Sequence, residues 1–139
     1  MSDYIHTVQY YETDKMGITH HSNYIRWMEE ARIAFMESIG LSYARMEEDG
    51  LFSPVTAVDC KYLTPTTFPD AVSIHVTVEE FKGVKLRLKY TMLNDSKKTV
   101  CEGHSEHCFL DRNNKIVALK KTNPALYNKF SELVEADSQ

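Results

Sequence analysis

The sequence of 139 residues lacks any long hydrophobic run, and no stretch approaches the roughly 18 consecutive apolar residues of a membrane-spanning helix. Its first residues are polar and acidic, where a secretory signal would have a basic end followed by an apolar block. We therefore expect a soluble, cytoplasmic protein without a membrane span.

Basic side chains and cysteine are also scarce. The 16 lysines and arginines are outnumbered by 20 aspartates and glutamates, which gives a formal net charge of −4. Because nucleic-acid phosphates require a concentration of basic side chains, a nucleic-acid partner is not expected. Cys60, Cys101 and Cys108 show no CxxC spacing, which argues against a disulfide framework and a structural zinc site. We expect buried thiols in a reducing compartment.

Apolar side chains are plentiful, at 42% of the sequence, which is enough for the core of one domain over residues 1–139. The clearest pattern begins at Tyr24, where apolar residues recur at spacings of three and four and predict one face of a helix. Gly40 is a typical stop for this helix, and the side chains of Ser22 and Asn23 are suited to cap its start. The apolar positions are Tyr24, Trp27, Met28, Ala31, Phe35 and Ile39.

Alternating apolar and polar residues predict strands around this helix. The predicted strands cover residues 4–10, 53–63, 72–79, 84–92 and 100–110, and a short helix with a polar tail follows from Asn123. One antiparallel sheet packed on one long helix is an α+β arrangement. Since such a sheet leaves edges and one face uncovered, we expect at least a homodimer, with the choice between dimer and homotetramer left open.

The segment from Glu12 to Asn23 is polar and has neither strand nor helix periodicity, which indicates a connecting loop. It places the carboxylate of Asp14, and then Gly17, before the start of the long helix. A helix start presents unpaired backbone N–H groups and a partial positive charge, which can hold the oxygen of a polarised carbonyl. Asp14 is suited to act there either as a nucleophile or as a general base for water, and both routes stay open.

Residues 11–32 resemble the signature of the 4-hydroxybenzoyl-CoA thioesterase family of hotdog-fold acyl-CoA hydrolases. The resemblance rests on Asp14, Gly17 and the Asn23-Tyr24 pair at the family's spacing, followed by an amphipathic helix. It implies a hotdog fold, in which an antiparallel sheet wraps around one long central helix. It also implies hydrolysis of an acyl-CoA to the free acid and CoA, without metal or cofactor, at sites between subunits. A thioester on acyl carrier protein is the less favoured substrate.

The same resemblance assigns roles within the loop. Asp14 is expected to be the catalytic carboxylate, and the backbone N–H near His21 is expected to donate to the thioester carbonyl, with no role required of the His21 ring. Glu12 stands where many relatives have a first aspartate, and it receives no catalytic role. The expected substrate-binding residues of this segment are Gly17, His20 and Asn23.

Basic side chains elsewhere are candidates for binding the phosphates of CoA, because a group with several negative charges needs cations near the pocket rim. Lys120 and Lys121 precede the last predicted helix. A second basic set lies on one predicted strand face and comprises Lys85, Arg87 and Lys89. On the next strand, His104 and His107 point in opposite directions and are expected to be solvated.

Other functions are less well supported by these residues. The adjacent His20 and His21 do not predict a metal site, because adjacent side chains diverge and no third ligand has a fitting spacing. A hydratase would need a histidine with an acid partner, which the sequence around His21 does not mark. A non-catalytic acyl-CoA-binding or regulatory module remains the alternative, against which stands the intact Asp14.

Overall fold

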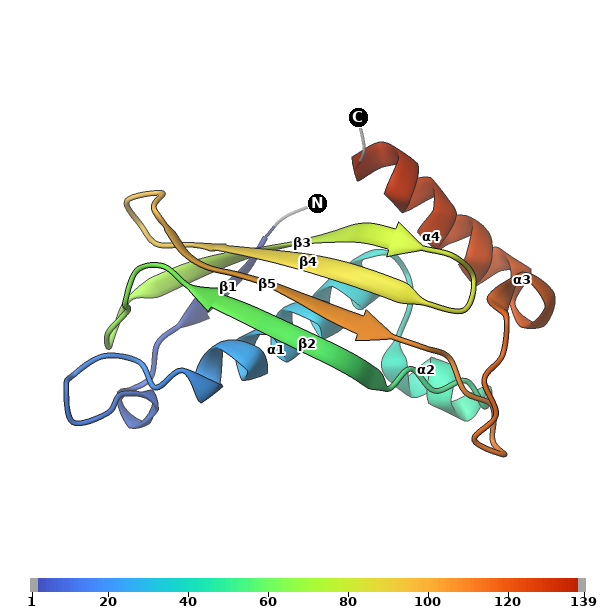
Figure 1. Cartoon of the computed structure of the whole chain (residues 1–139), viewed down its shortest axis with the longest axis horizontal. Helices are drawn as coiled ribbons and strands as arrows, with labels where there is room; N and C mark the ends of the chain where they lie inside the picture. Colours follow the sequence, from blue (N-terminus) through green and yellow to red (C-terminus); the bar gives the residue numbers. More distant parts are fainter. Residues whose placement is uncertain (1–2, 138–139) are drawn as a thin grey trace.

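The computed structural model describes residues 3–137, which form one five-stranded antiparallel sheet with the long helix α1 (Ser22–Ser38) against one face (Figure 1). The order across the sheet is β1 (Tyr4–Thr7), β3 (Ala71–Phe81), β4 (Leu86–Leu93), β5 (Thr99–His107) and β2 (Val55–Tyr62). The remaining helices are α2 (Tyr43–Glu48), α3 (Leu119–Thr122) and α4 (Pro124–Asp137). The predicted α+β arrangement is confirmed.

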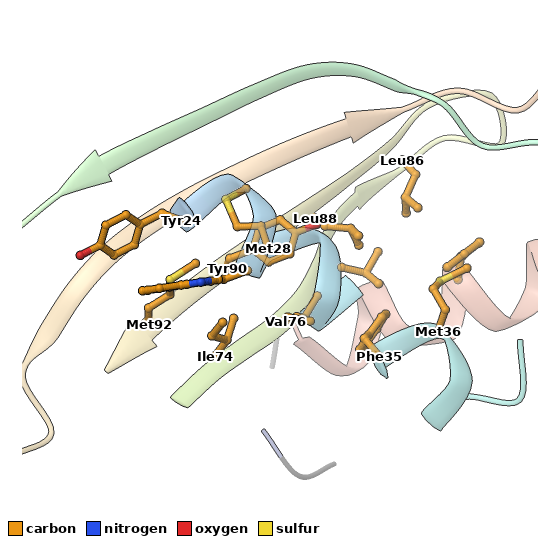
Figure 2. Packing of buried hydrophobic residues seen from close by; sticks show 14 of the residues in the cluster. Tyr24, Met28, Phe35, Met36, Ile74, Val76, Leu86, Leu88, Tyr90 and Met92 are labelled. Carbon is orange, nitrogen blue, oxygen red and sulfur yellow. The ribbon is translucent and has the colours of Figure 1, made fainter. Parts of the chain in front are cut away.

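Helix α1 buries the apolar face that its spacing predicts, with Trp27, Met28 and Phe35 among its buried side chains. Figure 2 shows this face meeting inward side chains of β3 and β4. The labelled partners from the sheet are Ile74, Val76, Leu86, Leu88, Tyr90 and Met92. Removal of each large apolar side chain from water contributes about 1.5–3 kcal/mol, so this contact holds the helix on the sheet.

The start of α1 is capped differently from the prediction. The cap position is His21, whose side chain makes no capping hydrogen bond, and the N–H of Ser22 donates to His20 Nδ1 at 3.2 Å. The amide of Asn23 is a donor, to the backbone oxygens of Glu12 at 3.0 Å and His20 at 3.2 Å. The prediction that Ser22 and Asn23 cap the helix was therefore wrong, because both side chains bond other partners.

The first strand is shorter than its alternating pattern predicts. β1 ends at Thr7, and Tyr10–Glu12 form a 3-10 turn in which Tyr10 is 77% exposed. The Glu12 side chain at the end of this turn is buried. The chain leaves the sheet at Thr7 because the turn places Glu12 in the interior. The alternation of apolar and polar residues in the sequence does not indicate this turn.

Helix α4 has 14 residues and is longer than the short helix that was predicted. Leu126 and Phe130 from α4 are buried, and the Phe130 ring contacts those of Phe81 and Phe109. Residues 138 and 139 of the predicted polar tail lie outside the described chain. None of the helices within residues 3–137 is long and apolar enough to cross a membrane.

The sheet face opposite α1 carries paired charges. Arg87 Nη1 lies 2.8 Å and Lys85 Nζ 3.1 Å from the same oxygen of Glu106, and His104 Nδ1 lies 2.9 Å from Asp59 Oδ1. Two members of the predicted basic row, Lys85 and Arg87, are therefore paired with an acid of the neighbouring strand β5. Surface pairs of this kind contribute little to stability.

His107 on β5 points away from His104, as predicted, but it is 1% exposed, so its predicted solvation was wrong. The strand alternates so that Gly103, Ser105 and His107 lie on the buried face. His107 Nε2 lies 2.7 Å from Ser105 Oγ, whereas its Nδ1 finds no hydrogen-bond partner within the described residues. The sequence predicted which face of β5 carries His107. It did not predict that this face is buried, because the burial depends on the packing of α1 against the sheet.

The two edges of the sheet are β1 and β2. β2 is exposed along most of its length, and its Val55 and Val58 side chains are 47% and 43% exposed. An edge strand of this length presents unpaired backbone groups to another chain.

Candidate active site

The loop between β1 and α1 holds Asp14 in a closed turn. Asp14 N–H donates to Ile18 O at 2.9 Å, and Gly17 N–H donates to Asp14 O at 3.0 Å. One carboxylate oxygen of Asp14 accepts from Met16 N–H at 2.8 Å. Gly17 has a φ of 81°, a left-handed conformation that glycine adopts without strain. These bonds fix the direction in which the Asp14 carboxylate points.

The loop is also held from outside, by the connection between β2 and β3. Thr19 N–H donates to Thr66 O at 2.8 Å, and the two threonine hydroxyls lie 2.6 Å apart. Tyr24 on α1 joins the same group, with its hydroxyl 3.0 Å from Thr66 Oγ1. Burial raises the pKa of Tyr24, which keeps this phenol neutral. The loop, the helix and the β2–β3 connection thus form one hydrogen-bonded unit.

A pocket of about 430 Å³ opens between these three parts. Asp14 and His21, the two predicted catalytic residues, both line it. The other lining residues are Met16, Ile18, Thr19, Tyr24, Tyr62, Leu63, Thr64 and Pro65. A single acid in a largely apolar pocket beside a helix start is an arrangement suited to reaction at a carbonyl.

The start of α1 borders this pocket at His21, the cap position of the helix. The ring of His21 stacks on that of His20 with centroids 4.3 Å apart, and its backbone oxygen accepts from Tyr62 Oη at 3.3 Å. Within residues 3–137 the backbone N–H of His21 makes no hydrogen bond. A donor of this kind at the positive end of a helix can receive a developing oxyanion.

The other predicted substrate-binding residues do not line the pocket. Gly17 O accepts from Thr67 Oγ1 at 2.6 Å, and His20 pairs with Ser22 Oγ at 2.9 Å. As described above, Asn23 braces the loop backbone. All three therefore serve the shape of the loop in this structure.

Lys120 and Lys121 are exposed on α3, which lies at the opposite end of the long axis from the Asp14 loop (Figure 1). Lys120 Nζ lies 6.0 Å from the centroid of the Tyr127 ring. A single chain does not bring these lysines to the pocket, so their role toward CoA stays a prediction that requires a second subunit.

Glu12 is the feature of this region that sequence reasoning missed. Its side chain is 6% exposed and accepts from Gln9 N–H at 2.8 Å and Trp27 Nε1 at 2.8 Å, and it lies 2.9 Å from His6 Nε2. Burial alone would raise the pKa of Glu12, but the hydrogen bonds outweigh it and hold that pKa below its ordinary value. The sequence does not signal this burial, because two of the three partners, His6 and Trp27, come from β1 and α1.

A second pocket, of about 210 Å³, lies further along α1 where the helix faces β2. It is lined by Ile25, Met28, Glu29, Arg32, Val55, Val58 and Ser105. Between the two pockets, the Cys60 thiol of β2 lies 3.4 Å from Met28 Sδ. All three cysteines are free, with Cys101 buried as predicted and the other two half-buried. The two pockets thus lie at different points along the junction of α1 and β2, with the contact between Met28 and Cys60 separating them.

Metal chemistry has no obvious ligand set in this region. Over the described residues, no group of three or more histidine, cysteine, aspartate or glutamate side chains is arranged to hold a metal ion. The adjacent His20 and His21 rings stack on each other, which does not point two ring nitrogens at one position.

The chain is similar to several known proteins. The family model of the thioesterase-like superfamily matches residues 8–133. A provisionally named esterase of Aquifex aeolicus is 36% identical over 118 residues, which cover 85% of this chain and 91% of that protein. A Bacillus subtilis protein provisionally named acyl-CoA thioesterase YneP is 30% identical over 126 residues, which cover 90% of this chain and 91% of the relative.

The crystal structure of DHNA-CoA thioesterase from Staphylococcus aureus superposes with a TM-score of 0.93 at 29% identity. The superposition covers 99% of this chain and 93% of that one. The region that the family model matches contains the Asp14 loop, α1 and the strands β2 to β5. The chain therefore belongs to the thioesterase-like superfamily, has its hotdog fold and is a thioester hydrolase.

Proposed function

We propose that the protein hydrolyses an acyl-CoA thioester to the free acid and CoA at the Asp14 pocket. The observation that supports this most strongly is that Asp14 and His21 line the same cavity, and that the backbone N–H of His21 makes no hydrogen bond within residues 3–137. The named relatives include a DHNA-CoA thioesterase and a provisional acyl-CoA thioesterase, which is consistent with a CoA ester as substrate.

The reaction requires a nucleophile on one side of the carbonyl and a donor on the other. In the first route, Asp14 takes a proton from water, whose oxygen adds to the carbonyl carbon while His21 N–H holds the oxyanion. The C–S bond then breaks, and the proton passes to the CoA thiolate. In the second route, Asp14 adds to the carbon, CoA leaves, and water hydrolyses the resulting anhydride. Both routes yield one acid and one thiol per water consumed.

The junction of α1 and β2 is the proposed place of the acyl group. The Asp14 pocket lies at one point of this junction, and the second pocket, which includes Val58, lies beyond the contact between Met28 and Cys60. This junction borders the exposed strand β2, so we propose that a second subunit covers it in a homodimer. The CoA phosphates would then be bound by Lys120 and Lys121 of another subunit. The free cysteines are consistent with a cytoplasmic location.

The test is thiol release from a panel of straight-chain, branched and aromatic CoA esters. Asp14→Asn keeps the volume of the side chain but removes its basicity, and is expected to lower kcat by about 100-fold to 10,000-fold. Binding of the acyl-CoA and the melting temperature are expected to remain close to those of the parent protein. Asp95→Asn, at an exposed turn, is the matched control and should retain full activity.

Full activity of Asp14→Asn would refute this mechanism. Acyl-CoA binding without turnover by the parent protein would instead favour the alternative of a non-catalytic or regulatory module.

A further inference from the structure

Among the acidic side chains that the structure describes, Glu12 alone is buried. Its Oε1 accepts from Gln9 N–H and lies 2.9 Å from His6 Nε2, and its Oε2 accepts from Trp27 Nε1. Burial of a carboxylate costs free energy unless its oxygens accept hydrogen bonds, and the hydrogen bonds to an ionised oxygen are strong. The three partners of the Glu12 side chain therefore join the end of β1, the following turn and α1 through one ionised group.

The backbone of Glu12 acts on the other end of the same loop. Its carbonyl oxygen accepts from His20 N–H at 2.8 Å and from Asn23 Nδ2 at 3.0 Å. Residues 13–19 thus form a loop that is closed by hydrogen bonds to the Glu12 backbone, and Asp14 lies two residues after Glu12. The place of Asp14 and of the His21 N–H is set by where Glu12 is held.

We propose that Glu12 is a positioning residue for the reaction, which holds Asp14 and the start of α1 in register across the pocket. This inference rests on the proposed function of Asp14. Glu12 does not line the pocket and its oxygens already have protein partners, so it acts through the loop and not on the substrate. Misplacement of a reacting group by about 1 Å can cost a hundredfold in rate.

The test compares Glu12→Gln with Glu30→Gln. The amide introduced by Glu12→Gln would place an N–H₂ group against one of the existing donors, and the loop would shift. Glu30 contacts the same histidine, at 3.5 Å from His6 Nδ1, and accepts from Tyr4 Oη at 2.6 Å, but it makes no contact with the loop. Glu12→Gln is expected to lower kcat by about 100-fold with little change in KM. Glu30→Gln should stay within about twofold.

Two further readouts separate positioning from a general loss of stability. In an Asp14→Asn background, Glu12→Gln should cause no additional loss of rate, since residues that act as a unit are not additive. Amide hydrogen exchange of residues 13–21 should speed up in Glu12→Gln and stay unchanged in Glu30→Gln. The exchange measurement needs no turnover, so it tests the positioning even where the proposed substrate class is wrong.

Unchanged kcat in Glu12→Gln, an equal fold loss in the Asp14→Asn background, or unchanged exchange in residues 13–21 would each overturn the proposal. If Glu12→Gln does not fold, Trp27→Phe replaces it, because this change removes one donor to Glu12 and keeps an aromatic ring. It should lower kcat by about tenfold and speed up the same exchange. Parent-like kcat and exchange in that variant would equally refute the role of Glu12.

Discussion

His107 shows how one buried side chain links the core to pH. Burial and the charge of Arg32 lower the pKa of His107 to about 4, against about 6.5 for an unperturbed histidine. Above about pH 6.5 the folded and unfolded states are both neutral at this residue. Between pH 6.5 and 4 only the unfolded state takes up the proton, so the free energy of unfolding falls as the pH falls.

We expect a loss of about 1.4 kcal/mol per pH unit in that window, or about 3 kcal/mol in all, measured by urea denaturation. The lowered pKa of Glu12 contributes stability that is lost only below about pH 4.5, where the unfolded state takes up a proton and the folded state does not. His107→Gln should flatten the slope between pH 6.5 and about 4.5. An unaltered slope in His107→Gln would show that another group titrates there.

At the same scale, the sequence predicted that Asp14 and His21 lie together because both belong to one short segment next to a strong helix pattern, and the structure places both at one pocket. It could not identify Tyr62 or Pro65, which reach the pocket from the end of a distant strand. It also assigned Glu12 no role, because the residues that bury Glu12 are adjacent only after β1 and α1 have packed.

Among the secondary-structure elements, β5 has a glycine, Gly103, packed tightly between β2 and α1. A Cβ at Gly103 would lie 2.7 Å from Asp59 O of β2 and 3.1 Å from Met28 Sδ of α1. A backbone oxygen in a paired strand cannot move away, so Gly103→Ala forces the strands or the helix apart. We expect a destabilisation of about 1–3 kcal/mol, measured by thermal denaturation.

The control for this prediction is Gly40→Ala at the end of α1. Gly40 has open space around it but a φ of 86°, so the cost of alanine there comes only from the left-handed backbone, about 1–2 kcal/mol. Of these two variants, only Gly103→Ala should also change the thioesterase activity, since Met28 lines the second pocket, where part of the acyl group is proposed to lie. A variant Gly103→Ala with parent-like stability and activity would contradict the close packing described for β5.

The elements were predictable from the sequence to different degrees. α1 was expected to within two residues, since six apolar positions repeat over its length and tertiary packing only reinforces them. β1 was overestimated because its alternation continues past Thr7 into a turn. The order β1-β3-β4-β5-β2 could not be read from local pattern, because strand neighbours such as β1 and β3 are separated by the whole of α1.

At the scale of the whole molecule, the two edge strands β1 and β2 are the candidates for pairing with a second copy of the chain. β2 has eight residues and an exposed apolar margin, whereas β1 has only four. We expect Val58→Lys to place a charge on the dimer edge, shift the protein to monomer in sedimentation velocity and lower activity, because inserted charges oppose edge-to-edge pairing. Ile5→Lys, at a 63% exposed position of β1, should leave the dimer intact.

The opposite pattern, with the dimer lost in Ile5→Lys and kept in Val58→Lys, would place the interface at β1. A parent protein that sediments as a monomer would refute the homodimer itself.

Trp27 is the single tryptophan of the chain, and its indole N–H donates to Glu12 Oε2. All of the protein's indole fluorescence therefore originates beside the residue that holds the Asp14 loop. Its emission wavelength and lifetime report on the surroundings of the indole, which are that hydrogen bond together with the rings of His6 and Tyr24. A change at the contact between Trp27 and Glu12 can consequently be followed optically in the unlabelled protein, without a substituted or dye-modified variant.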